Sequence, residues 1–129
     1  MCSSDLAPLV GAMMKIKDSY NVDRLTQELA LAALSDLGPM QASAARIVAT
    51  RDRVAAALEA MGCRVCPSAT NFLWIRPARR PAPDVYAGLR ARGVLVRHFD
   101  MPRTAGWLRV TDGTDGDMDR FLAAMRHVG

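Results

Sequence analysis

Two arginines near the carboxyl end of the chain are the side chains best suited to chemistry. Arg97 ends the apolar run Val94-Leu95-Val96, and Arg109 lies inside the apolar segment Trp107–Thr111. A guanidinium with apolar neighbours requires an anion, and its planar fork accepts a carboxylate or a phosphate through two hydrogen bonds. Two strands that carry one arginine each and are joined by a short loop could therefore hold two anionic groups of one small ligand.

The spacing of these arginines also allows two plainer arrangements. Side chains of a strand alternate between the two faces of a sheet, so both guanidiniums could point outward into solvent. Each could instead pair with a nearby carboxylate, Asp100 or Asp112. The residue pattern leaves these arrangements open beside the two-anion site.

The cysteines are candidates for metal or redox chemistry, but their pattern argues against both. Cys63 and Cys66 have the spacing of zinc and thiol redox sites, yet no second such pair and no paired histidine completes a set of four ligands. Three cysteines, counting Cys2, cannot form a closed disulfide framework. We therefore expect apolar, buried cysteines, no metal site and a reducing, cytoplasmic location.

The charge of the chain is basic but spread along the sequence. The 129 residues include 17 lysines plus arginines against 13 acidic residues, a net charge of +4, and only Lys15 and Lys17 are lysines. The arginines form no basic block with interleaved aromatic residues, which is the pattern of a nucleic-acid-binding protein. No segment approaches the roughly 20 apolar residues of a membrane span. Neither nucleic acid nor a membrane is an expected partner.

Helical periodicity fills the first half of the chain. Apolar residues recur at three- and four-residue steps over Asp5–Lys17, Val22–Asp36 and Pro39–Met61. Asn21 precedes the second segment as an N-cap, and Gly62 ends the third. Three helices are therefore predicted before the first strand.

After Gly62 the pattern becomes mixed. The segment Asn71–Ile75 is short and apolar and predicts a buried strand. Thr114 and Asp117 have the spacing of a capping box that begins a last helix. The other predicted elements are a helix at Asp84–Arg92 and strands at Val94–Arg97 and Trp107–Thr111. Together they predict an α/β domain of mixed α+β type, with helices packed on a small sheet.

Four segments of the sequence together resemble one enzyme family. They are Lys15–Gln27, Pro67–Phe72, Gly93–Phe99 and Trp107–Thr114. In order and spacing they are similar to segments of histidinol-phosphate aminotransferases, which are class I/II, fold-type I enzymes that use pyridoxal phosphate. The resemblance extends over Leu6–Val128 and implies the C-terminal small domain of such an enzyme.

The resemblance implies roles for four residues. In that family the arginine of the Leu-Arg-Val-Thr segment binds the substrate carboxylate, which by position is Arg109. The arginine after Gly-Val-Leu-Val is associated with the substrate phosphate, which by position is Arg97. Asn71 and Tyr20 lie in family motifs near the active-site cleft and are candidate substrate-binding residues. Plainer roles also suit them, Asn71 as a turn residue that opens a strand and Tyr20 as an anchor before the N-cap.

The activity that the resemblance implies is transamination with pyridoxal phosphate. It implies a homodimeric enzyme of histidine biosynthesis, with histidinol phosphate and glutamate or 2-oxoglutarate as substrates. Relatives that act on aromatic amino acids or threonine phosphate share the scaffold. The family's N-terminal large domain, which carries the Schiff-base lysine, has no match here, and Lys15 and Lys17 are at the wrong place to replace it. We therefore expect no catalytic residue and no covalently bound cofactor in the isolated chain, which should be inactive.

The domain boundaries follow from the same resemblance. Residues 1–6 have no counterpart in the family pattern and are predicted to be a non-native leader derived from a sequencing adaptor. Residues 7–129 are predicted to be the small domain with its leading helices. Two other classes remain open: a stand-alone anion-binding module that uses Arg97 and Arg109 without a cofactor, and a protein-interaction module.

Overall fold

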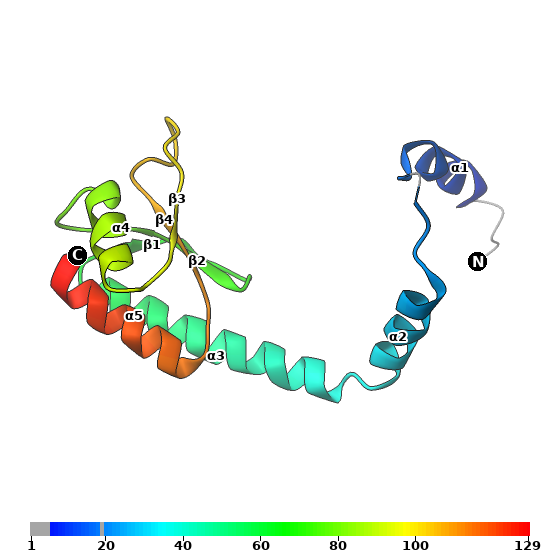
Figure 1. Ribbon diagram of the computed structural model, residues 1–129, viewed down its shortest axis with the longest axis horizontal. Helices are drawn as coiled ribbons and strands as arrows, with labels where there is room; N and C mark the ends of the chain where they lie inside the picture. Colours follow the sequence, from blue (N-terminus) through cyan, green and yellow to red (C-terminus); the bar gives the residue numbers. More distant parts are fainter. Residues whose placement is uncertain (1–5, 19) are drawn as a thin grey trace. The chain divides into compact units, whose positions relative to one another are not determined.

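The computed structural model describes residues 6–18 and 20–129 (Figure 1). The chain divides into two compact units, Met1–Leu37 and Gly38–Gly129. Of the predicted leader, residues 1–5 lie outside the described part, and Leu6 immediately precedes the first helix.

The first unit contains two short helices, α1 (Ala7–Ile16) and α2 (Arg24–Ser35). Asp23 caps α2, because its carboxylate accepts hydrogen bonds from the backbone N–H and the hydroxyl of Thr26 at 3.0 and 2.6 Å. The prediction of Asn21 as the N-cap is therefore wrong. The side chain of Asp23 is the one that satisfies a free N–H of the first turn.

The apolar side chains of α1 and α2 remain exposed. Leu9 and Met13 of α1, and Leu25 and Leu29 of α2, are between 57% and 69% exposed, and neither helix has a buried residue. The amphipathic pattern correctly predicts both helices. It does not identify a surface that would cover their apolar faces.

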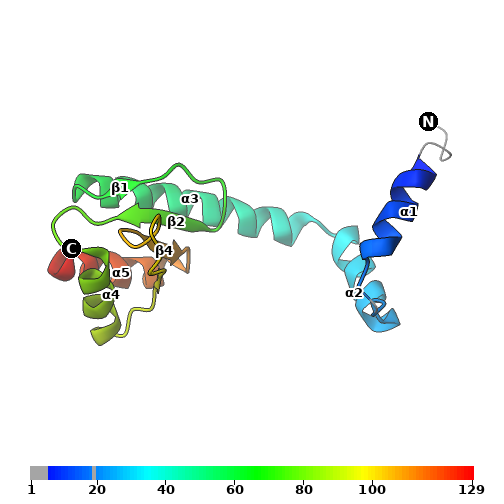
Figure 2. The ribbon, with the colours of Figure 1, turned by 90° about the horizontal axis from the view of Figure 1, so that it is seen from above.

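The second unit combines three helices with a four-stranded antiparallel sheet, which confirms the predicted fold class. The helices are α3 (Gly38–Ala60), α4 (Ala82–Ala91) and α5 (Asp115–Val128). The strands are β1 (Arg64–Val65), β2 (Phe72–Arg76), β3 (Arg97–His98) and β4 (Leu108–Thr111), in the order β1-β2-β4-β3. α5 lies along α3 (Figure 1), and Figure 2 shows α3 beside β1 and β2.

Alternation along β2 and β4 separates the core from the other face of the sheet. Leu73 pairs with Val110 and Ile75 with Leu108, and all four are at most 3% exposed. Side chains of all three helices join the same core, including Val54, Leu58, Val85, Leu89, Phe121 and Met125. The residues between the buried ones therefore lie on the opposite face, which we call the open face.

Glycines end two of the helices by turning the backbone. Gly62 and Gly93 have positive φ angles of 84° and 74°, a region that side chains with a Cβ rarely adopt. After each glycine the next N–H returns to the helix, from Cys63 to the carbonyl of Leu58 and from Val94 to that of Leu89, both at 3.0 Å. Gly62 thus ends the third predicted helix as expected.

The predicted strand at Val94–Arg97 is displaced in the structure. Only Arg97 and His98 pair with β4. The N–H of Val94 donates to the carbonyl of Leu89 at the end of α4, and Val94 and Val96 line a hollow of about 550 Å³ together with Val110 and residues of α5. The way α4 ends therefore directs the backbone away from β4 until Arg97.

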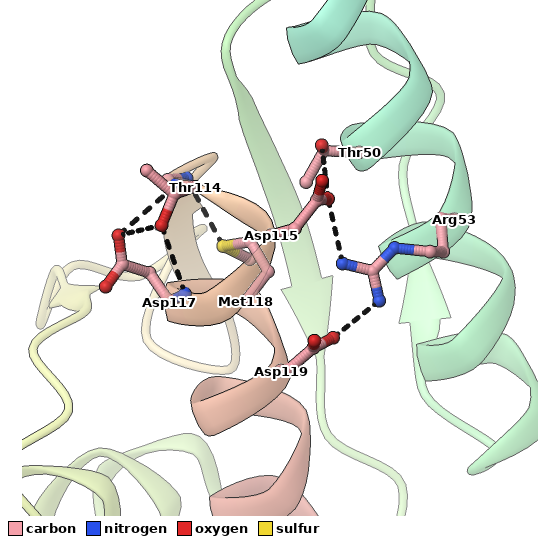
Figure 3. Close-up of polar contacts among 8 residues, drawn as sticks. Thr50, Arg53, Thr114, Asp115, Asp117, Met118 and Asp119 are labelled. Carbon is pink, nitrogen blue, oxygen red and sulfur yellow. Dashed lines mark hydrogen bonds and ion pairs between the residues drawn. The ribbon is translucent and has the colours of Figure 1, made fainter.

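Polar contacts attach the start of α5 to α3 (Figure 3). The hydroxyl of Thr50 donates to the carboxylate of Asp115 at 2.8 Å, and the guanidinium of Arg53 donates to Asp115 and Asp119 at 3.1 and 2.7 Å. Hydrogen bonds from Thr50 and Arg53 lower the pKa of Asp115. The same turn of α5 is thus fixed to the helix on which the sheet packs.

The predicted capping box is present at the beginning of α5. The hydroxyl of Thr114 accepts from the N–H of Asp117, and the carboxylate of Asp117 accepts from the N–H of Thr114, both at 3.3 Å. These bonds satisfy two backbone donors that a helix start leaves free. They begin α5 four residues after the last residue of β4.

We predict that Thr114→Ala lowers the free energy of unfolding by about 1 kcal/mol, because an N-cap hydroxyl is lost. The measurement is urea unfolding followed by circular dichroism. Thr114→Ser keeps the hydroxyl and should lie within a few tenths of a kcal/mol of the wild type. An alanine variant as stable as the serine variant would show that the cap contributes nothing.

Candidate anion-binding site

Arg97 and Arg109 lie side by side on the open face. Arg97 of β3 is the register partner of Arg109 of β4, and Arg109 is in turn opposite Trp74 of β2. Directly opposite residues project to the same face of an antiparallel sheet. Arg97 is exposed and Arg109 is half-buried. The structure therefore brings the two arginines together, as the two-anion prediction requires.

Aromatic rings lie against the guanidinium groups of both arginines. The ring of Phe99 lies 5.6 Å from the guanidinium carbon of Arg97 and 6.0 Å from that of Arg109. Phe72 provides a second ring at 5.5 Å from Arg109. A cation above an aromatic face is attracted to it without losing its hydrogen-bond donors. The guanidiniums are thus positioned while their N–H groups stay available for a ligand.

Neither arginine pairs with the carboxylates that the sequence suggested. Within the described part of the chain neither forms an ion pair, and the buried Nε of Arg109 and both carboxylate oxygens of Asp112 have no hydrogen-bond partner. The pairing of Arg109 with Asp112 is therefore wrong. Three positions separate these residues, so strand alternation directs them to opposite faces.

Asn71 immediately precedes β2 and lies close to the end of β4. Its backbone carbonyl accepts a hydrogen bond from the N–H of Asp112 at 2.8 Å, and its side chain is exposed. Thr70, the residue before Asn71, accepts a hydrogen bond at its carbonyl from Arg51 of α3 at 3.2 Å. The side chain of Arg51 is only 11% exposed. The sequence reasoning missed Arg51, because nothing in its helical surroundings marks it as the residue that holds this loop.

Tyr20 belongs to the first unit, where it is 86% exposed. Arg97, Arg109 and Asn71 all belong to the second unit. A ligand role for Tyr20 therefore stays a prediction, as does the ligand role of the Asn71 side chain.

Asp112 is a buried carboxylate without a compensating hydrogen bond. It borders a hollow of about 210 Å³ with Ser43, Arg46 and Thr50, among other residues. Burial raises the pKa of Asp112, and the positive charge of Arg51 partly opposes that effect. The protonated form is therefore favoured by folding, and stability should fall as this carboxyl ionises.

The prediction of buried, apolar cysteines is confirmed for Cys63. Cys63 is buried in the core, where burial raises the pKa of its thiol, and Cys66 is half-buried and free. Cys2 lies outside the described residues. Among residues 6–18 and 20–129, no cluster of three or more His, Cys, Asp or Glu side chains could hold a metal ion.

The lysines do not fit a Schiff-base site. Lys15 and Lys17 are exposed residues of the first unit, and the ammonium of Lys17 donates to the neighbouring carbonyl of Asp18 at 3.0 Å. The second unit, which carries both candidate arginines, contains no lysine. The residues of the site therefore suit an anionic ligand and do not suit covalently held pyridoxal phosphate.

The second unit is an α/β domain with a small antiparallel sheet, helices on one face and, on the other, two arginines that form no ion pair within the described residues. The family model for aminotransferase class I and II matches residues 1–125 of this sequence. The chain belongs to the class I and II aminotransferase family.

Individual relatives agree with this family. A histidinol-phosphate aminotransferase of Burkholderia mallei is 39% identical over 125 residues, which are 95% of this chain and 35% of the relative. A crystal structure from Burkholderia pseudomallei K96243, assigned as an aminotransferase, superimposes with a TM-score of 0.78 at 30% identity, over 95% of this chain and 38% of that one. The histidinol-phosphate aminotransferase of Sinorhizobium meliloti, solved in complex with pyridoxal-5'-phosphate, shares the fold with a TM-score of 0.73 at 23% identity, over 92% of this chain and 34% of that one. The chain thus spans about a third of the length of the relatives it matches.

The described helices include none that is both long enough and apolar enough to cross a bilayer.

We predict that Asp112→Asn stabilises the protein at neutral pH by about 1 kcal/mol, because it removes an unpaired buried charge. The pKa of Asp112 is raised on folding, so the contribution of this group to stability is complete below pH 3.8, its ordinary pKa, and is lost as pH rises through the raised pKa. The gain of the variant should therefore shrink towards acid pH. Urea midpoints measured from acid to neutral pH provide the test.

Asp115→Asn is the matched control for this prediction. The pKa of Asp115 is lowered by Thr50 and Arg53, so its contribution to stability is present above pH 3.8 and is lost as pH falls further. This variant should destabilise the protein at neutral pH. Asp112 and Asp115 variants that shift stability in the same direction would contradict the assignment of the buried charge.

Proposed function

We propose that this chain forms the substrate-binding part of a histidinol-phosphate aminotransferase. In this role Arg109 binds the carboxylate of glutamate or 2-oxoglutarate, and Arg97 binds the phosphate of histidinol phosphate. The observation that carries the proposal is the register pairing of these arginines on one face, where neither forms an ion pair with a described residue. The similarity to named histidinol-phosphate aminotransferases supports the choice of substrate class.

The chemistry of the two arginines is binding and alignment. A guanidinium fork fixes both the position and the orientation of a carboxylate or phosphate, and correct orientation lowers the entropic cost of reaching the transition state. The ring of Phe99 lies 5.6 Å from the guanidinium carbon of Arg97 and 6.0 Å from that of Arg109, so both forks contact the same ring. The pair can thus orient an anionic substrate without donating or accepting a proton itself.

The remaining parts of the reaction belong to other protein elements in this proposal. Pyridoxal phosphate supplies the electron sink of transamination when it is bound, and a large domain would carry it together with the Schiff-base lysine. The proposed assembly is a homodimer in the cytoplasm. The chain by itself would be inactive.

A protein-interaction module is the second candidate. The observation that favours it is the exposure of apolar side chains on α1 and α2, such as Leu9 and Leu29 at 57% and 62%. Surfaces of this kind commonly mark contacts with another protein or domain. Variants of Arg97 and Arg109 distinguish the two candidate functions, because only the aminotransferase role requires these arginines.

We predict that Arg109→Ala and Arg97→Ala impair different half-reactions of a chimera in which this chain replaces the matching part of the Burkholderia mallei enzyme. Arg109→Ala should lower kcat/KM for glutamate and 2-oxoglutarate by about 10- to 150-fold, the value of a charge-assisted contact that persists in the transition state. Arg97→Ala should lower kcat/KM for histidinol phosphate by a similar factor and affect glutamate little. Half-reaction kinetics with each substrate measure the difference.

Arg126→Ala is the control, because Arg126 is exposed on α5, a helix that packs against the core face of the sheet. It should leave all half-reactions unchanged. If Arg97→Ala slows glutamate as much as histidinol phosphate, Arg97 has a structural role and the phosphate assignment is wrong.

We further predict that the isolated chain forms no specific Schiff base with pyridoxal phosphate, because Lys15 and Lys17 are exposed and lie outside the unit that holds the arginines. Incubation with the cofactor, borohydride reduction and peptide mapping should give only partial labelling of both lysines. A stoichiometric adduct at one of them, lost on its substitution by arginine, would contradict the proposed division of roles.

A further inference from the structure

A small hollow lies between α3 and the turn that joins β4 to α5. Its volume is about 210 Å³. It is lined by Ser43, Arg46, Ile47 and Thr50 of α3 and by the four residues from Asp112 to Asp115. Asp112 follows Arg109 by three positions, so strand alternation directs it to the helix side of the sheet. The hollow is therefore separate from the open face, where the candidate anion-binding site lies.

The carboxylate of Asp112 has no partner at this hollow. Both of its oxygens are buried and accept no hydrogen bond within the described residues. Arg51 is nearby, but its guanidinium donates to the carbonyl of Thr70 and to the carboxylate of Asp52. A carboxylate can accept about four hydrogen bonds, and buried polar groups that accept none are rare in folded proteins. Asp112 is therefore a charged acceptor that its own chain does not satisfy.

Arg46 brings a positive charge to the same hollow. Hydrogen bonds from Thr50 and Arg53 lower the pKa of Asp115 most, and the charge of Arg46 lowers this pKa further. Arg46 is exposed and forms no ion pair within the part of the chain that the structure describes. The hollow thus combines an unsatisfied carboxylate with a guanidinium that has no ion-pair partner.

Hydroxyl groups and one aliphatic side chain complete the lining on α3. The hydroxyl of Thr50 donates to Asp115 at 2.8 Å, which leaves its oxygen able to accept a further hydrogen bond. Ser43 adds a second hydroxyl and Ile47 an aliphatic side chain. The volume is about seven times that of one water molecule in the liquid. The hollow therefore has room for a small organic molecule.

The charges around the hollow favour a zwitterion over a simple ion. A bare metal cation would be attracted to Asp112 but repelled by Arg46 and Arg51. A simple anion would be attracted to the arginines but repelled by Asp112. A molecule that carries both an ammonium and a carboxylate group matches both charges.

We propose that this hollow binds a free α-amino acid, with its ammonium group on Asp112 and its carboxylate on Arg46. An ammonium group supplies three N–H donors for the unsatisfied oxygens, and a guanidinium fork holds a carboxylate through two hydrogen bonds. The bound amino acid compensates the buried charge of Asp112, so binding stabilises the fold. This inference goes beyond the proposed aminotransferase function, because Arg97 and Arg109 take no part in it.

The test is an NMR titration of the full chain with L-alanine, followed at the backbone amides of Gly113 and Thr114, which line the hollow. We expect shifts confined to the lining residues and a Kd of about 1 mM, a modest affinity for a ligand of few atoms. Propionate lacks the ammonium group and ethylamine lacks the carboxylate. Each should bind about 10- to 150-fold more weakly than alanine, the value of one charge-assisted contact.

Asp112→Asn and Arg46→Gln each remove one charge of the hollow. Each should weaken the binding of alanine about 10- to 150-fold. Because Asp112→Asn is expected to stabilise the free chain, a loss of binding in this variant does not come from a failure to fold. Urea unfolding gives a second readout, in which alanine should raise the midpoint of the wild type and leave that of Asp112→Asn unchanged.

Asp84→Asn and Arg90→Gln are the matched controls, since they remove the same charges from exposed positions on α4. Both should bind alanine as the wild type does. Arg109→Ala should also retain this binding, which separates the inference from the proposed transamination. In the chimera with the Burkholderia mallei enzyme, Arg109→Ala should still bind radiolabelled alanine.

Four results would overturn the proposal. They are equal weakening by a control variant, loss of alanine binding in Arg109→Ala, equal binding of propionate or ethylamine, and absence of shifts at about 10 mM alanine, ten times the expected Kd. Loss of binding only in the chimera would also overturn it, because the large domain would then fill the hollow.

Discussion

The pairing of β2 with β4 is the constraint on which the second unit depends. Leu73 and Ile75 meet Val110 and Leu108 across this pair, and their burial fixes the register. A slip of one residue would turn these four side chains to the opposite face and bring Trp74 and Arg109 into the core. Because a buried, unpaired guanidinium is costly, the hydrophobic core and the candidate site enforce the same register.

The sequence predicts local features well where the signal is itself local. The capping box of Thr114 and Asp117, the end of α3 at Gly62 and the buried strand at Phe72–Arg76 all depend on residues within a few positions of one another. Two local predictions fail for a physical reason. Asp23 provides a cap in place of Asn21, and the end of α4 takes the N–H of Val94 away from the sheet.

The composition of the open face could not be predicted in the same way. The sequence reasoning selected Arg97 and Arg109 because each has apolar neighbours in the chain, and their register confirms that they lie together. Arg64 of β1 and Arg76 of β2, which are register partners, have no such signal. Their place on the same face depends on how β1 pairs with β2, and this pairing is set by contacts between residues distant in sequence. Arg51 was missed for the same reason, since its partner Thr70 is 19 positions away.

The side-by-side placement of Arg97 and Arg109 also affects the edge of the sheet itself. Like charges directly opposite each other weaken a strand pair, and β3 contains only the two residues Arg97 and His98. An anion held between the two guanidiniums would convert this repulsion into attraction. If the proposed site binds an anion, binding would therefore stabilise the pairing of β3 with β4, and that pairing in turn holds Arg97 in the site.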